Sequence, residues 1–156
     1  MGAISLLDNV PEQRVIGLDT TPFIYSLEAH PVYGPLVRPF FESRVKTGLN
    51  TVVTSVVTLS EVLVQPLRCE QADLVDRYRT LLTRGRNLTL ASITPAIAER
   101  AAKIRATYAI RLPDAFQIAA ALEHGATHFL TNDDRLRKVT EVTVLILDDY
   151  LPAQSS

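Results

Sequence analysis

The stretch that decides the fold reads Val15-Ile16-Gly17-Leu18-Asp19, an apolar run of β type that ends on a carboxylate and is followed at once by Thr20-Thr21-Pro22. A short continuous apolar run is typical of a strand that is buried on both faces of a parallel sheet. Ligands of open α/β sheets bind in the crevice outside the carboxyl ends of such strands. Asp19 therefore stands where this class of fold places its chemistry.

Strand-like and helix-like segments alternate along the rest of the chain, which indicates a mostly parallel sheet covered by helices. We expect strands near 15–19, 51–57, 88–91, 127–131 and 142–147. Helices are expected at 22–28, 35–47, 70–84, 95–108 and from Pro113 until Gly125 stops the last one. A further helix opens at Thr58 and is interrupted at Gln65-Pro66. The prediction is an α/β fold with three layers, α/β/α, around a mostly parallel central sheet of about five strands.

Length and composition predict one domain, because the chain has 156 residues, of which 47% are hydrophobic. We expect this domain at about 14–150, between an N-terminal extension (1–13) and a C-terminal tail (151–156). The single cysteine, Cys69, excludes an internal disulfide framework and fits a reducing cytosol, so we expect a cytoplasmic protein. The start of the chain has no basic region before an apolar core, and no apolar run is long enough for a membrane span. A net charge of −1 gives no overall attraction to nucleic acid, so a polyanion would need local basic groups and metal ions.

Four acids follow strand ends or open helices, and three of them have an ordinary structural explanation. Glu61 completes a capping box with Thr58, and Asp114 complements the positive end of its helix dipole. Asp133 suits the N-cap of a short helix over 134–138, as does the preceding Asn132. Asp19 is harder to explain in this way, because Thr20 or Thr21 can cap the helix that follows it.

Taken together, the acids indicate a metal site. Right-handed crossovers bring the ends of the first, second and fourth strands to the same side of the sheet, where the head of the helix at Pro113 can add a fourth acid. Two carboxylates 4 Å apart repel by about 4 kcal/mol at an effective dielectric constant of 20, so a cluster of four must hold protons or cations. Mg²⁺ and Mn²⁺ take oxygen ligands and share them with substrate phosphates. The chemistry expected at such a site is phosphodiester hydrolysis.

Four segments resemble the motifs of PIN-domain nucleases in their order and spacing. They are Leu18-Asp19-Thr20-Thr21 before Phe23-Ile24-Tyr25, Ser60-Glu61-Val62-Leu63 with Pro66 close behind, Leu112-Pro113-Asp114-Ala115-Phe116-Gln117-Ile118-Ala119-Ala120-Ala121, and Leu130-Thr131-Asn132-Asp133-Asp134-Arg135-Leu136. The resemblance covers about residues 14–150, and in size and motif wording it is most similar to the VapC toxins of toxin–antitoxin pairs. Each motif is weak singly, but four in order are specific.

The resemblance implies an endoribonuclease that hydrolyses RNA with Mg²⁺ or Mn²⁺ held by Asp19, Glu61, Asp114 and Asp133. Asp19 and Asp114 would be the core ligands, and the other two acids would act directly or through water. The side chains that would support these ligands or a water are Thr131, Thr21 and Asn132. Asn is frequent in the family two positions after the first Asp, so Thr21 is a departure from its pattern. Asp134, in the same turn as Asp133, is an alternative fourth acid.

Substrate and partners are also expected from the sequence. Arg111 and Arg135 flank two of the motifs and are candidate RNA contacts, although a solvated helix face explains the basic run at 135–138 equally well. The resemblance implies an antitoxin whose tail occupies the acidic groove, and a homodimer. A catalytically inactive PIN-like RNA-binding or regulatory protein remains an alternative. So does a phosphotransfer protein with Asp19 as nucleophile, although Thr21 replaces the second Asp of a DxD-type phosphatase.

Overall fold

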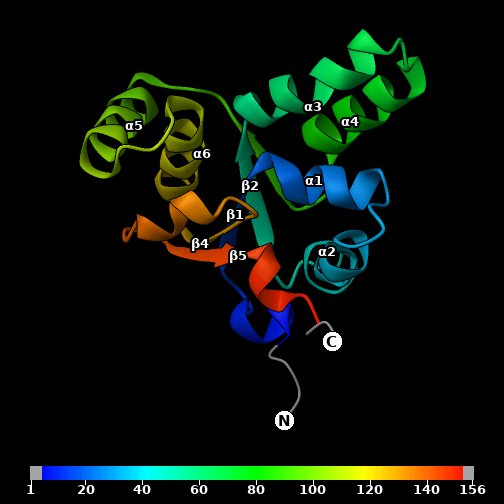
Figure 1. Cartoon of the computed structure of the whole chain (residues 1–156), viewed down its shortest axis with the longest axis horizontal. Helices are drawn as coiled ribbons and strands as arrows, with labels where there is room; N and C mark the ends of the chain where they lie inside the picture. Colours follow the sequence, from blue (N-terminus) through cyan, green and yellow to red (C-terminus); the bar gives the residue numbers. More distant parts are fainter. Residues whose placement is uncertain (1–4, 153–156) are drawn as a thin grey trace.

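The computed structural model describes residues 5–152, so the expected extension, the expected tail and the segment judged for a secretory signal lie partly outside the described residues. Its core is a single sheet of parallel strands in the order β3-β2-β1-β4-β5. The strands are β1 (Val15–Leu18), β2 (Thr51–Ser55), β3 (Leu88–Ala91), β4 (Ala126–Thr131) and β5 (Thr143–Ile146). The predicted α/β class and the mostly parallel sheet of about five strands are confirmed, and β1 lies at the centre of the sheet (Figure 1).

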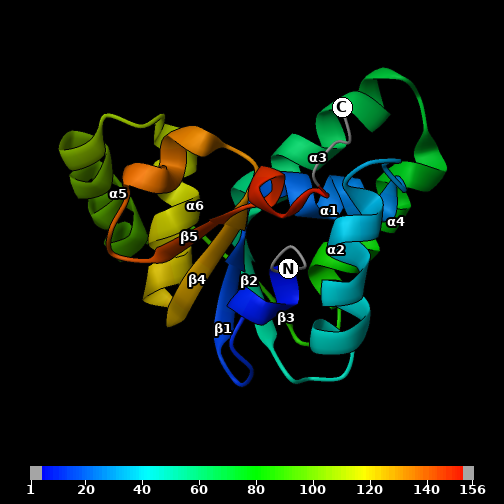
Figure 2. The ribbon, with the colours of Figure 1, turned by 60° about the horizontal axis from the view of Figure 1, so that its bottom comes forward.

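Helices cover both faces of the sheet, as predicted. The longer ones are α1 (Thr20–Leu27), α2 (Gly34–Phe40), α3 (Val56–Arg68), α4 (Ala72–Arg84), α5 (Pro95–Tyr108) and α6 (Leu112–Glu123). The short ones are η1 (Leu6–Asn9), the π-helical η2 (Phe41–Val45), η3 (Asp134–Lys138) and η4 (Leu147–Tyr150). Figure 2 shows α5 and α6 on one side of the strands and α1, α2 and α4 on the other, and the two buried apolar clusters divide in the same way. No helix within residues 5–152 is long and apolar enough to cross a membrane.

The central strand β1 sends alternate side chains to the two faces, which is the geometry that its apolar run requires. Ile16 and Leu18 are fully buried on the side of α1. Gly17 faces α6, where an added Cβ would lie 2.6 Å from the Cβ of Ala121 and 2.8 Å from Cδ1 of Phe129. This close approach holds α6, and with it the first turn of α6, in a defined place against the central strand.

Three local predictions at helix starts and interruptions are wrong. Strand β2 ends at Ser55 instead of residue 57, because the Ser55 side chain caps α3 and accepts a hydrogen bond from the N–H of Val57 at 3.1 Å. Thr58 therefore lies inside the helix, and the capping box between Thr58 and Glu61 does not form. Helix α3 also continues through Pro66 to Arg68, so the proline does not interrupt it.

The cap of α1 is also different from the prediction. Asp19 itself is the N-cap residue, and its Oδ1 accepts a hydrogen bond from the N–H of Thr20 at 2.8 Å. Neither Thr20 nor Thr21 has this role, because both lie within the helix. The carboxylate that ends the central strand thus serves the helix and still faces the edge of the sheet.

Candidate functional site

An open cavity of about 470 Å³ lies at the edge of the sheet where β1 and β4 end. All four predicted acids line it: Asp19, Glu61, Asp114 and Asp133. The remaining lining residues are Thr20, Thr21, Ile24, Tyr25, Arg111, Thr131, Asn132 and Asp134. Of the residues that the sequence marks for the site, Arg135 is the one that does not line the cavity. The sequence-distant acids therefore lie together on one side of the molecule, as the handedness of the crossovers predicts.

Asp19 is the most buried of the four acids, with 8% of its surface exposed. Its two carboxylate oxygens accept hydrogen bonds from the N–H of Thr20 at 2.8 Å and from the hydroxyl of Thr131 at 2.7 Å. Burial, with smaller contributions from the charges of Asp114 and Glu61, raises the pKa of Asp19 to about 6 against the lowering effect of the two hydrogen bonds. A carboxyl group perturbed in this way, in a cavity with other acids, is typical of a functional site.

Asp114 lies in the first turn of α6, and 15% of its side chain is exposed. Burial raises the pKa of Asp114, and the charges of Asp133 and Glu61 add to this effect. The guanidinium of Arg111, with Nε 4.0 Å from a carboxylate oxygen of Asp114, lowers the pKa in opposition. Asp114 therefore occupies the dipole-favoured position that its sequence predicts, but it does so among other acids.

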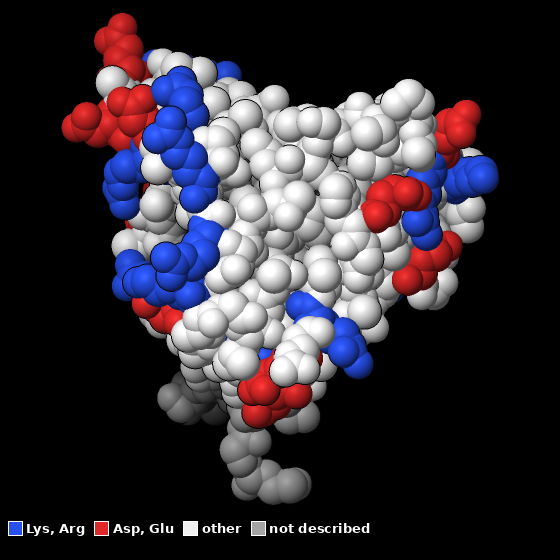
Figure 3. All heavy atoms as spheres, turned by 180° about the vertical axis from the view of Figure 1, so that it is seen from behind, with Lys and Arg blue, Asp and Glu red and all other residues white. Residues whose placement is uncertain are grey.

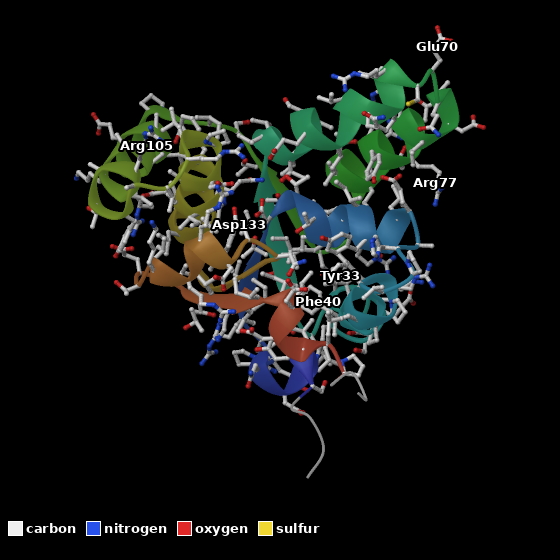
Figure 4. The ribbon with its side chains drawn as sticks, in the orientation of Figure 1. Tyr33, Phe40, Glu70, Arg77, Arg105 and Asp133 are labelled. Carbon is white, nitrogen blue, oxygen red and sulfur yellow. The ribbon has the colours of Figure 1, made fainter. Side chains whose placement is uncertain are left out.

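Asp133 is held by an arginine. It caps η3, and Arg135 donates from Nε at 2.9 Å to one carboxylate oxygen and from Nη2 at 2.7 Å to the other. These hydrogen bonds lower the pKa of Asp133. Figure 4 shows Asp133 between α6 and α1, whereas Arg77 lies on α4 and Arg105 on α5, both away from the acids. Arg135 is thus close to the site through Asp133, with 65% of its own side chain exposed.

Asp134 is less well placed than Asp133 to be the fourth acid. It pairs with Arg137 at 2.6 Å and exposes 78% of its side chain, against 24% for Asp133. Glu61 is an exposed residue of α3, and its Oε1 accepts a hydrogen bond from the hydroxyl of Thr20 at 2.9 Å. The four acids are therefore held by different partners, and only Asp133 has a direct cationic one of close geometry.

Two threonines support the acids in different ways. The hydroxyl of Thr131 is fully buried, donates to Asp19 and accepts from the backbone N–H of Asp133 at 3.1 Å, so it connects two of the acids. The hydroxyl of Thr21, which stands where the family often has Asn, is buried without a hydrogen-bond partner among the described residues. Thr131 therefore joins Asp19 to Asp133, whereas the Thr21 hydroxyl makes no hydrogen bond with the described residues.

Asn132 orients an aromatic side chain at the rim of the cavity. Its Nδ2 donates to the hydroxyl of Tyr25 at 3.3 Å, and its Oδ1 accepts from the backbone N–H of Asp148 at 3.0 Å. The ring of Tyr25 stacks on that of Tyr33, with centroids 4.5 Å apart and planes 17° from parallel. Asn132 thus fixes a stacked tyrosine pair beside the acids.

A buried polar layer beneath the acids is absent from the predicted site. It consists of Thr54, Ser55, Thr58 and Gln117, none of which is more than 2% exposed. The signal in the sequence is Gln117, the single amide within the apolar run Ala115–Leu122 of α6. A polar residue on the buried face of a helix needs hydrogen-bond partners, but the sequence does not say which.

The oxygen donors at the cavity fit a hard divalent cation. Within residues 5–152, no three Asp, Glu, His or Cys side chains are arranged to bind one ion as they stand. Asp133 is bound to Arg135, and Glu61 accepts a hydrogen bond from Thr20. Mg²⁺ needs fewer protein ligands than this, since it commonly takes one or two carboxylates and fills its other positions with water and phosphate oxygens. Asp19 and Asp114 offer two carboxylates that line this cavity.

Comparison with solved structures finds proteins of similar fold. The VapBC2 complex of Rickettsia felis bound to a promoter DNA fragment aligns with a TM-score of 0.67 at 14% identity over 85% of this chain and 98% of its own. The sarcin–ricin loop cleaving toxin VapC20 of Mycobacterium tuberculosis gives a TM-score of 0.64 at 15% identity over 83% and 98%, and the DNA-bound VapBC of Salmonella typhimurium gives 0.59 at 18% over 86% and 98%. At these identities the likeness shows the fold alone.

A search of curated protein sequences finds no match to this chain. The family model of the PIN domain, in contrast, matches residues 16–142, which contain all four acids and most of the described chain. The resemblance expected from the four motifs is thereby confirmed. This chain belongs to the PIN domain family.

Proposed function

We propose that this protein is a metal-dependent endoribonuclease that hydrolyses RNA phosphodiester bonds, and that it is the toxin of a toxin–antitoxin pair. The observation that carries the proposal is the gathering of four carboxylates around one cavity, with Asp19 so buried that its pKa is raised to about 6. Like charges in a partly buried pocket destabilise the folded protein unless protons or cations neutralise them. Divalent cations bound at such a site would therefore stabilise the folded protein.

Asp19 and Asp114 are the proposed core ligands of Mg²⁺ or Mn²⁺, and Glu61 and Asp133 complete the set directly or through water. A cation held there supplies Lewis-acid chemistry, because it lowers the pKa of a bound water and neutralises charge on a phosphate. Thr131 holds the carboxylate of Asp19 in place by its hydrogen bond of 2.7 Å. The protein's own contribution is therefore to fix the carboxylates at the edge of a rigid sheet.

Two features support RNA as the substrate. Arg111 lines the cavity with 57% of its side chain exposed, and Arg135 forms an ion pair with Asp133, which lines the cavity. The stacked Tyr25 at the rim is suited to the face of an unpaired base. On the face opposite to the view of Figure 1, a wide central area has no Lys or Arg, and basic side chains lie at its margins beside acidic ones (Figure 3). This central area therefore offers no basic patch for a polyanion.

An antitoxin is the proposed protein partner, because two of the similar structures are VapBC complexes bound to DNA. The proposed occupant of the acidic cavity in the inhibited state is a segment of that antitoxin. A homodimer and a cytoplasmic location are proposed with it, on the PIN-domain resemblance to VapC toxins. Co-expression of this chain with its neighbouring reading frame, followed by size-exclusion chromatography, tests both assemblies.

The activity is tested with a fluorescent single-stranded RNA in the presence of Mg²⁺ or Mn²⁺. We expect cleavage that a chelator abolishes and that Asp19→Asn and Asp114→Asn each abolish. Asp76→Asn is the matched control, because Asp76 is an exposed residue of α4 whose partner is Arg79. Cleavage that survives both the chelator and the two site variants would reject the proposal. RNA binding without cleavage supports the inactive alternative, and an acyl-phosphate trapped on Asp19 supports phosphotransfer.

A further inference from the structure

The buried polar layer beneath the acids connects Gln117 of α6 to Glu61 through a hydroxyl group. Its members are Thr54, Ser55, Thr58 and Gln117, with Thr20 of α1 above them at 7% exposure. Buried donors and acceptors must be paired, since an unpaired one is costly where water is excluded. Donor and acceptor roles in this layer can therefore be assigned from the groups that can only donate or can only accept a hydrogen bond.

Ser55 determines which way the Gln117 amide points. The backbone N–H of Ser55 can only donate, and it lies 3.3 Å from Oε1 of Gln117. The Ser55 hydroxyl accepts from the N–H of Val57, and its own proton is donated to the same Oε1 at 2.6 Å. A flipped amide would place NH₂ protons against the Ser55 N–H, which has no acceptor to offer. The carbonyl of Gln117 therefore faces Ser55, and its NH₂ group faces the threonines.

The backbone carbonyl of Leu18 determines the direction of the threonine pair. This carbonyl can only accept, so the Thr54 hydroxyl donates its one proton to it at 2.8 Å. In the 2.7 Å contact between Thr54 and Thr58, Thr58 must then be the donor. The oxygen of Thr58 is left to accept from Nε2 of Gln117 at 2.5 Å.

The carboxylate of Glu61 determines the direction of Thr20. A carboxylate only accepts, so the Thr20 hydroxyl donates to Oε1 of Glu61 at 2.9 Å. The oxygen of Thr20 is then an acceptor, and Nε2 of Gln117 lies 3.4 Å from it. With both hydroxyl protons used elsewhere, the 3.4 Å approach of Thr20 to Thr58 has no proton to form a hydrogen bond. Only a donor placed between these two oxygens, as the NH₂ of Gln117 is, satisfies both.

We infer that Gln117 is a positioning residue of this site: its NH₂ group donates to Thr58 and Thr20 and so keeps the Thr20 hydroxyl directed at Glu61. This inference rests on the proposed function, which makes Glu61 a metal ligand. Thr20 also donates its backbone N–H to Asp19, so a disturbance of Thr20 reaches two acids. Gln117 is not among the residues that line the cavity, and it acts on the cation only through Thr20.

The test replaces the amide and measures binding of Mn²⁺ alone, by the electron paramagnetic resonance signal of the free ion, together with RNA cleavage. Gln117→Met keeps a similar volume and removes the donors, and we expect the dissociation constant for Mn²⁺ to rise by about three- to tenfold, the range of one net hydrogen bond. Gln117→Leu is the second variant if the methionine protein does not fold. An unchanged Mn²⁺ dissociation constant in the folded variant overturns the inference.

A double-mutant cycle with Thr20→Val separates positioning from general loosening of the core. If Gln117 acts through the Thr20 hydroxyl, Gln117→Met changes the Mn²⁺ dissociation constant by less than about twofold once that hydroxyl is gone. If the two substitutions multiply in effect, Gln117 acts by another path and the inference is wrong. Thr20→Ser keeps the hydroxyl, and in that background the full effect of Gln117→Met should return.

Asn50→Leu is the matched control for stability. Asn50 is a buried amide, 1% exposed, which donates to the carbonyls of Pro11 and Arg14. It precedes β2, whereas Ser55 and the polar layer lie at the other end of that strand. We expect Asn50→Leu to lower the urea midpoint of unfolding without a change in Mn²⁺ affinity. A loss of affinity equal to that of Gln117→Met would overturn the inference.

The wild-type protein distinguishes the two proposals. If it neither binds Mn²⁺ nor cleaves RNA, the proposed function fails and the inference fails with it. If it does both and Gln117→Met does so equally well, the proposed function stands and the inference alone is wrong.

Discussion

Replacement of Asp19 by Asn should stabilise the metal-free protein at neutral pH while it abolishes cleavage. The ordinary pKa of an aspartate is 3.8, and burial raises the pKa of Asp19 in the folded protein to about 6. The folded protein therefore binds more protons than the unfolded chain between these two values, and the free energy of unfolding falls as the pH rises through this window. Above about pH 6 the ionised Asp19 exerts its full destabilising effect, and below pH 4 it exerts almost none.

The size of the effect follows from the same two values. At about 1.4 kcal/mol per pH unit, the difference between 3.8 and about 6 corresponds to about 3 kcal/mol. Asp19 is 8% exposed, so solvent screening reduces this figure little. The asparagine can keep the hydrogen bond from Thr20, but it offers Thr131 an amide instead of an acceptor oxygen, which costs part of the gain. We expect Asp19→Asn to be more stable than the wild type by about 1–3 kcal/mol at pH 8.

The assay is urea unfolding followed by circular dichroism, at pH values from 4 to 8 and in chelator. The stability difference between Asp19→Asn and the wild type should grow across the window from 3.8 to about 6 and level off above it. Saturating Mn²⁺ should then raise the wild-type stability more than that of the variant, because the cation neutralises a charge that the variant lacks. Asp76→Asn, at an exposed position, should show neither effect. A wild type that is the more stable protein at pH 8 without metal would refute the reasoning.

Three further substitutions have defined outcomes. Arg135→Ala removes the hydrogen bonds that lower the pKa of Asp133, so this pKa should rise in nuclear magnetic resonance titrations, and the freed carboxylate should bind Mn²⁺ more tightly. The slope of the logarithm of the RNA-binding constant against the logarithm of the salt concentration should become less steep by about 0.7. An unchanged slope would show that Arg135 makes no phosphate contact. Thr131→Val removes a hydrogen bond that lowers the pKa of Asp19, so this pKa should rise above its wild-type value. In the same urea series, the free energy of unfolding should therefore continue to fall up to a higher pH than in the wild type. Gly17→Ala adds a methyl group 2.6 Å from a side-chain atom of α6 and should lower the free energy of unfolding by about 1–3 kcal/mol; a neutral result would mean that α6 can move away from β1.

The sheet and the convergence of the acids can be predicted from sequence because both depend on long-range rules with few exceptions. Apolar runs such as Val15–Leu18 mark buried parallel strands, and the handedness of crossovers brings their carboxyl ends to one side. These two rules are sufficient to predict that Asp19 and Asp133 lie at the same edge of the sheet. The alternation of strands and helices likewise predicts the three layers.

The helix caps could not be predicted, because several neighbouring residues satisfy the same local rule. Ser55 and Thr58 both have a side-chain oxygen that can cap α3, and only the observed end of β2 decides for Ser55. At α1, a carboxylate competes with two threonines for the cap, and Asp19 takes it while remaining in the site. The spacing of Thr58 and Glu61 is thus compatible with a capping box that does not form.

The buried polar layer is beyond the reach of single-sequence reasoning for a different reason. Gln117 stands out in its apolar helix, but its partners come from β2, α3 and α1, so the pattern of any one element does not contain them. Prediction of such a layer requires the relative placement of α6 and β1, which the close approach at Gly17 determines. The residues that hold the acids are therefore visible only in three dimensions.

The central claim is that these carboxylates coexist by sharing divalent cations, and anomalous scattering from crystals soaked in Mn²⁺ tests it most directly. We predict at least one anomalous peak inside the cavity, coordinated by Asp19 and Asp114. Well-ordered crystals with no peak there at saturating Mn²⁺, or with peaks only at other sites on the surface, would contradict the claim.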